Sequence, residues 1–258
     1  MTNRVEVYKP YIGSGKVYIR DASLSNGPNY YIGEVSELKL SIDEEVKTLA
    51  SHTDSGGGTH AEVRRIDSVT ASMTLHDLNA DNIALATKGV RTSVDAGTVT
   101  DETVTAFSGA LIRLANPAAS SVVVTSNDGT ITYTEGDDYE VRGEGLFILD
   151  SGAISSAVEA LAIPDNGLPL LVSYSHSAYS LVEPLTANST NWAITFGGMN
   201  EADSDKACVV DLHKVSLGAA SEHSLIGDDF GSLALEGTLQ KDTSKGSSES
   251  AYYRVQQV

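Results

Sequence analysis

The feature that most constrains the fold is a long alternating stretch at residues 30–49. In an extended chain, successive side chains point to opposite sides, so strict alternation predicts a strand with one buried face. The apolar side consists of Leu38, Leu40 and Ile42. The polar side consists of Glu37, Lys39, Ser41 and Asp43 and is mostly acidic. Antiparallel sheets allow one buried and one polar face, so we expect this strand to form a wall around something negatively charged.

Two further stretches alternate in the same way, at residues 67–75 and 230–240. In the first, four small hydroxyl side chains alternate with apolar ones: Ser68, Thr70, Ser72 and Thr74. In the second, the side chains that face away from the leucines are Ser232, Ala234, Glu236 and Thr238. These sets and the polar side of the long strand are candidates for the lining of a channel. An ordinary solvated sheet face is the alternative, because polar side chains are common on strand surfaces.

The segment at residues 51–65 is rich in glycine and contributes nothing to a core. Connections of this length are uncommon in compact domains. We expect a projecting loop or a loosely held hairpin that contacts a neighbouring subunit. Its arginine pair is placed to meet acids on that neighbour. The residues predicted to act here are Ser51, Gly56, Gly57, Gly58, Arg64 and Arg65.

Composition changes at residues 101–182, which carry half of the formal net charge of −18. Short β-rich runs separated by turns are typical of a β-sandwich. We therefore predict an inserted Ig-like β-domain at 101–182 within a discontinuous main domain at 1–100 and 183–258. One helix is expected, at about residues 79–88, capped by Asn79 or Asp77. Residues 1–14 are expected to form a loose arm.

The charge balance and the cysteine content exclude several classes of protein. A net charge of −18 opposes wrapping of nucleic acid, because such binding relies on Lys and Arg at the phosphates. The single cysteine, Cys208, excludes a disulfide within the chain and is expected to be a small buried side chain. No apolar run reaches membrane-spanning length, and the N-terminus lacks the apolar centre of a signal peptide.

Catalytic and metal-binding patterns are weak. His52, Asp54 and His60 share the glycine-rich segment, but no third strong ligand follows at the spacing that zinc sites use. Acid pairs such as Asp228–Asp229 lie in turn-like contexts, where solvated carboxylates are usual. No phosphate-binding loop, dinucleotide fingerprint or nucleophile elbow is found. The sequence therefore predicts no catalytic residue, no cofactor and no metal, and an enzyme is the weaker hypothesis.

The order of these pieces resembles the major tail tube protein of tailed bacteriophages. The most specific parts are LHDLNADNIALATKG, which begins at Leu75, and DDFGSLALEGTLQKD, which begins at Asp228. The resemblance covers residues 15–95 and 190–243. It leaves 101–182 as an insertion, which many tail tube proteins carry on the outside of the tube.

The resemblance implies a tail-tube-type β-sandwich or half-barrel with one flanking helix. Subunits of that family form rings, usually hexameric, which stack into a tube that conducts DNA from capsid to host. The three polar sets would line the lumen, and the glycine-rich segment would contact the next ring.

The implied partners are other copies of the chain, the tape measure protein, the tail terminator and the baseplate or distal tail proteins. DNA would pass without specific binding, and no membrane insertion is expected. The implied location is the virion tail, after assembly in the cytoplasm of the bacterial host. A tube protein of the type VI secretion kind and an adhesin-like β-sandwich binding module stay open as alternatives.

Overall fold

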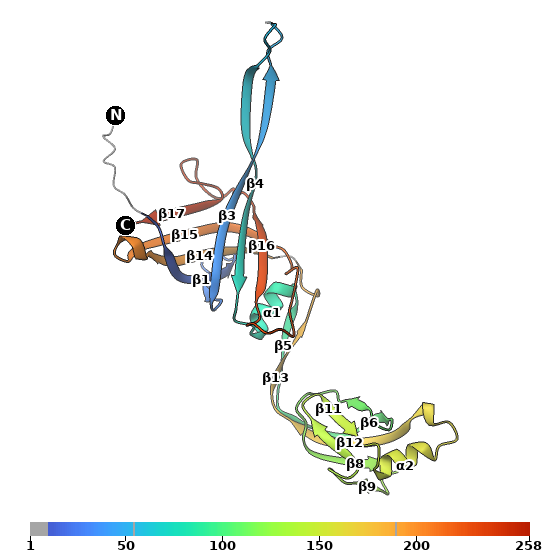
Figure 1. Cartoon of the computed structure of the whole chain (residues 1–258). Helices are drawn as coiled ribbons and strands as arrows, with labels where there is room; N and C mark the ends of the chain where they lie inside the picture. Colours follow the sequence, from blue (N-terminus) through green and yellow to red (C-terminus); the bar gives the residue numbers. More distant parts are fainter. Residues whose placement is uncertain (1–9, 54, 189) are drawn as a thin grey trace. The chain divides into compact units, whose positions relative to one another are not determined.

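The computed structural model describes residues 10–258 except residues 54 and 189. These residues form two compact units, one up to Arg91 together with Val182–Val258 and the other Thr92–Leu181. The prediction of a mainly β fold is confirmed, and no sheet within the described residues closes into a barrel (Figure 1). The second unit begins before the predicted boundary at residue 101, because β6 (Gly97–Ala106) runs through that position as one strand.

Unit 1 is built on one antiparallel sheet with the strand order β2-β1-β14-β15-β16-β4-β3, and β17 also pairs with β15. Most of the predicted arm lies outside the described residues, but Gly13 and Ser14 already belong to β1. The strands are β1 (Gly13–Asp21), β2 (Tyr30–Tyr31), β3 (Val35–Ala50), β4 (Thr59–Leu75), β14 (Asn191–Asn200), β15 (Lys206–Leu217), β16 (Leu233–Leu239) and β17 (Tyr253–Gln257). A short 3-10 turn, Glu201–Asp203, joins β14 to β15.

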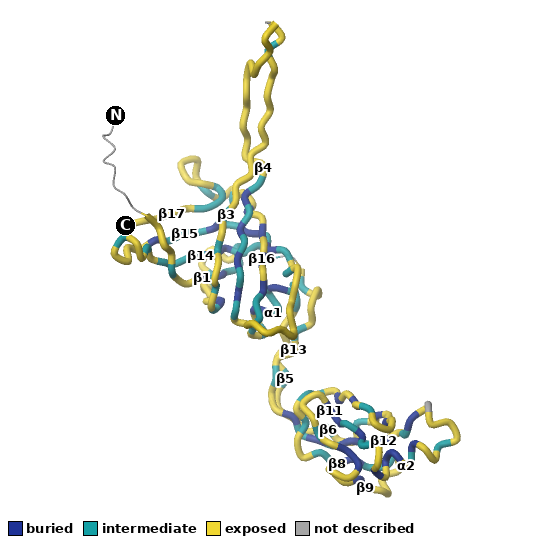
Figure 2. The backbone as a smooth tube through the Cα atoms, viewed as in Figure 1, coloured by how far each residue is buried: buried dark blue, intermediate teal, exposed yellow. Residues whose placement is uncertain are grey.

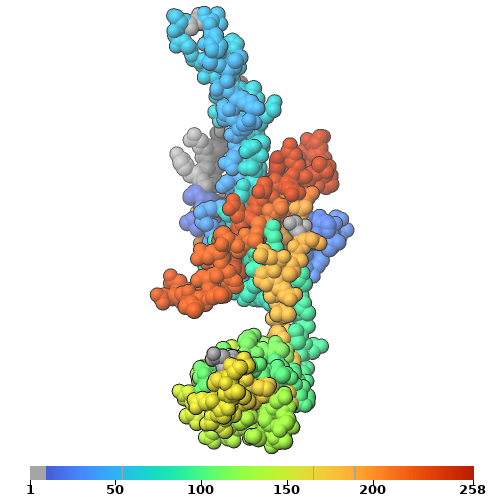
Figure 3. All heavy atoms as spheres, turned by 90° about the vertical axis from the view of Figure 1, so that its right-hand side faces the viewer, coloured from blue at the N-terminus to red at the C-terminus, as the bar shows by residue number. Residues whose placement is uncertain are grey.

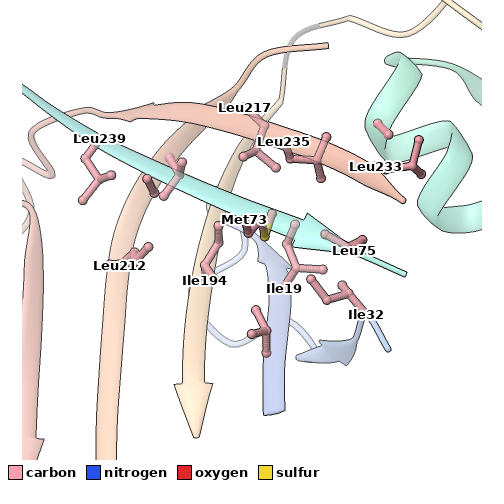
Figure 4. Packing of buried hydrophobic residues seen from close by; sticks show 14 of the residues in the cluster. Ile19, Ile32, Met73, Leu75, Ile194, Leu212, Leu217, Leu233, Leu235 and Leu239 are labelled. Carbon is pink, nitrogen blue, oxygen red and sulfur yellow. The ribbon is translucent and has the colours of Figure 1, made fainter. Parts of the chain in front are cut away.

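The sheet folds over itself, so that β4 and β16 cross β1 and β14 with the core between them (Figure 4). The inward set predicted on β4 is confirmed, because Val69, Ala71, Met73 and Leu75 are all buried. On β3, Leu38 and Leu40 pack against this core, as predicted. Ile42 does not, since it is 49% exposed and lies beyond the end of the core.

The helix α1 (Ala80–Thr87) begins after an asparagine cap, as predicted. The side chain of Asn79 accepts a hydrogen bond from the Asn82 backbone N–H at 2.9 Å. Asn82 is itself buried, and its amide donates to the carbonyl oxygens of Ile32 and Asp77. Lys88, rather than Gly89, takes the left-handed conformation that ends the helix.

Unit 2 has its own hydrophobic core and two small antiparallel sheets. One consists of β6, β12 (Leu168–His176), β8 (Ser120–Ser126) and β9 (Thr132–Tyr133), and the other of β10 (Tyr139–Arg142), β11 (Gly145–Ile148) and β7 (Leu111–Arg113). The sequence did not predict its helix α2 (Ala153–Glu159), nor the 3-10 turn Pro164–Asn166. A two-stranded pair, β5 (Val90–Val94) with β13 (Tyr179–Glu183), contains both points at which the chain passes between the units.

Candidate assembly surfaces

The three polar sets predicted from the sequence lie together on neighbouring strands, β3, β4 and β16. The strand register aligns Lys39 with Ser72 and Ser72 with Glu236. Further rows on the same face are Glu37–Thr74–Ala234, Ser41–Thr70–Thr238 and Asp43–Ser68. Ser232 lies outside the strand, directly before β16. Acids and small hydroxyls therefore form one continuous polar face, opposite the core; its assignment to a channel stays a prediction.

The side chains of this polar face interact mainly with each other. The ammonium group of Lys39 lies 2.5 Å from the carboxylate of Glu37. The hydroxyl of Ser68 donates to the carboxylate of Asp43 at 3.0 Å. The one cation of the face is therefore paired, and Asp43 and Glu236 remain as uncompensated acids within the described ion pairs. The face carries net negative charge, and its remaining polar groups are neutral hydroxyls.

β3 and β4 continue past the core as a two-stranded hairpin (Figure 1). Its outer part, residues 41–50 and 59–67, is exposed throughout (Figure 2). We call this part the projecting hairpin. Several large aliphatic side chains on it are about half exposed: Ile42, Val46, Leu49, Val63 and Ile66. An isolated two-stranded hairpin is at best marginally stable in water, so this segment is suited to being covered by another molecule.

The tip of the projecting hairpin contains three consecutive glycines, residues 56–58. The backbone N–H of Ser51 donates to the carbonyl oxygen of Gly58 at 2.7 Å. Gly57 and Gly58 have positive φ angles, +65° and +121°, which side-chain-bearing residues rarely adopt. Of the two predicted forms of residues 51–65, a projecting loop or a loosely held hairpin, the structure shows the hairpin, because the residues from Thr59 belong to β4.

The two arginines of the projecting hairpin differ in their surroundings. Arg64 lies 2.7 Å from the carboxylate of Glu62 and 3.4 Å from that of Glu44. Arg64 therefore pairs with acids of its own hairpin, and its contact with acids on a neighbouring subunit stays a prediction. Arg65 is exposed and has no ion-pair partner among the described residues. The exposed ion pairs of Arg64 contribute little to stability.

Among the described strands, β3 is the last of the sheet and pairs only with β4. Its other edge therefore presents unpaired backbone N–H and C=O groups along a strand of 16 residues. Long exposed edges are templates for pairing with another chain. β3 thus contributes to the polar face, forms one strand of the projecting hairpin and is also an open edge of the sheet.

A polar pocket that sequence analysis missed has a volume of about 740 Å³. It lies over β1, β14, β15 and β17, on the side opposite the core. Four cationic side chains line it, and we call it the cationic pocket: Arg20, Lys214, Lys245 and Arg254. These residues come from four distant parts of the chain, so no local pattern in the sequence could have indicated it.

The structure gives no metal-ligand cluster among the residues it describes. Asp54, one of the weak ligand candidates, lies outside them. Cys208 is buried, as predicted, at 2% exposure. No helix in the described part of the chain is long and apolar enough to span a bilayer.

Comparison with known proteins adds one finding. The model of a family described as protein of unknown function UCP028589 matches residues 10–256, almost the whole chain. No curated protein matches the chain.

Proposed function

The chain belongs to this family, whose description names no activity, and we propose that it is a structural subunit that assembles into rings and tubes, as tail tube proteins of bacteriophages do. The observation that carries the proposal is the projecting hairpin. Its aliphatic side chains are about half exposed and belong to neither core of the described residues, and Ser51 is hydrogen-bonded to Gly58 at its tip. The partner proposed to cover these side chains is a second copy of the same chain.

The open edge of β3 supports the same proposal. Pairing of this edge with a strand of the next copy would satisfy its backbone groups and extend the sheet across the contact. A head-to-tail contact of this kind, repeated around an axis, closes into a ring. Stacking of rings would then cover the projecting hairpin.

The polar face suits the lumen of such a tube. Uncompensated acids repel phosphates, and neutral hydroxyl donors hold phosphates more weakly than cationic side chains do. Screening limits this repulsion to about 8 Å at physiological salt, which is enough to keep DNA from the wall. The net charge of −18 agrees with a surface that lets nucleic acid pass without binding it.

Sedimentation velocity and electron microscopy of the purified chain test the proposal. We expect rings or tubes whose fraction rises with concentration. Deletion of residues 56–58 removes the glycines of the tip, so it should abolish stacking and leave the folded subunit intact. A chain that stays monomeric at high concentration refutes the tube. If that monomer also bound a ligand through unit 2, the adhesin-like alternative would replace it.

A further inference from the structure

Unit 1 carries a segment between β15 and β16 with no packing of its own. We call residues 221–231 the acidic loop. All of residues 221–230 are exposed, and Leu225, Ile226 and Phe230 are 82%, 96% and 97% exposed. Asp228 and Asp229 lie between these apolar side chains. Three large apolar side chains so fully exposed beside two carboxylates are typical of a contact surface.

The cationic pocket has the opposite character. The three acids that line it already have other partners. Asp211 accepts from Arg254 and Thr195, and Asp21 and Asp242 accept from Ser23 and Ser244 in tight turns. Hydrogen bonds from hydroxyls leave the carboxylates charged, so four cations face three acids and the pocket carries one surplus positive charge.

Hydrogen bonding in the pocket is also incomplete. Lys214 and Lys245 form no ion pair within the described residues. The Nε atom of Arg20 is buried without a hydrogen-bond partner in the described chain. In a protein with a net charge of −18, a pocket with this surplus of cations is suited to an anion, and carboxylates match guanidinium and ammonium donors.

The acidic loop of the same copy cannot fill the cationic pocket. Figure 3 shows the orange-red segment that contains the acidic loop on one side of unit 1 and the red segment after β16, which borders the pocket, on the other. A contact between these two surfaces must join different copies, head to tail. Leu24, 53% exposed, stands in the chain between Ser23 and Ser25, which line the pocket, and offers an apolar contact.

We propose that the cationic pocket of one copy binds the carboxylates of Asp228 and Asp229 from the acidic loop of the next copy. Leu225, Ile226 and Phe230 then pack on the rim around the charged contact. The contact is heterologous, so it can repeat from copy to copy, and it closes into a ring where the rotation between copies allows. This inference rests on the proposed function, because it names surfaces through which the subunits meet.

Charge reversal on each side tests the contact. Asp228→Lys with Asp229→Lys, and separately Lys214→Glu with Lys245→Glu, should each raise the concentration needed for half-assembly about tenfold or more, as loss of close interfacial charge pairs does. The four substitutions combined in one chain should recover most of the assembly. Glu144→Lys with Asp150→Lys, two exposed acids of unit 2, gives the matched change in net charge and should have no effect.

Cysteine cross-linking locates the contact without relying on the concentration needed for half-assembly. A mixture of Asp229→Cys and Lys214→Cys chains should oxidise to covalent dimers, whereas Asp229→Cys with Lys206→Cys, at the far end of β15, should not. The native Cys208 is buried and does not compete.

Two outcomes separate this inference from the proposed function. Wild-type rings with unaffected charge-reversal variants and no cross-link overturn the contact alone. A wild-type chain that never assembles overturns both. Binding of inorganic phosphate in the cationic pocket, with assembly unchanged by the loop variants, also overturns the contact.

Discussion

The projecting hairpin provides the most direct test of assembly, through the double variant Leu49→Ser with Val63→Ser. These side chains are 56% and 51% exposed. Full burial of a Leu or Val side chain stabilises by about 1.5–3 kcal/mol, so covering the exposed half of each contributes about 1 kcal/mol. Losing both costs about 2 kcal/mol per contact, which corresponds to a roughly thirtyfold rise in the concentration for half-assembly.

Sedimentation velocity over a concentration series measures this shift, and thermal unfolding supplies the check on the subunit. The double variant should unfold as the wild type does, because both side chains lie outside the two cores. Val123→Ser with Leu111→Ser is the matched control, since these side chains of unit 2 are 48% and 46% exposed. An assembly midpoint within about twofold of the wild type would refute the argument that the hairpin is covered.

Three further outcomes are expected. Removal of Thr92–Leu181, with the chain rejoined at Val182, should leave rings visible by electron microscopy, because unit 2 has its own core; a folded product that never assembles would place unit 2 in the contact. Replacing Glu37, Asp43 and Glu236 with Lys should leave assembly intact and slow DNA ejection, and an unchanged rate would remove these residues from the lumen. In unit 2, hydrogen bonds from Ser126 and Thr130 lower the pKa of Asp128 to about 2. A lowered pKa stabilises the folded state above about pH 4 and loses that effect as pH falls toward 2, so Asp128→Ala should lower the Tm at pH 6 and leave it nearly unchanged at pH 2.

The parts of the fold that the sequence predicts are those that a local rule determines. Alternation identified the buried side of β4, because that strand crosses the core along its inner half. The side-chain chemistry of Asn79 identified the start of α1. Alternation also assigned each of the three polar sets to the side of its strand that faces away from the core. Because β3, β4 and β16 are neighbours in register, the three sets lie together.

The failures share a different cause, which is that local patterns carry no information on where a core ends. Ile42 continues the alternation of Leu38 and Leu40, yet it lies on the projecting hairpin. α2 is a helix of 7 residues, too short to show a helical repeat. The cationic pocket depends on tertiary folding alone.

The projecting hairpin also limits which assemblies can satisfy it. The register pairs Glu44 with Ile66 and Val46 with Arg64 on one face, and Lys47 with Val63 on the other. Side chains on opposite faces of a hairpin point apart, so apolar surface remains on both sides. A symmetric dimer through one face would leave the other face in water. A ring that is followed by a second ring offers a neighbour to each face, which is why a stacked tube fits this hairpin better than any closed dimer.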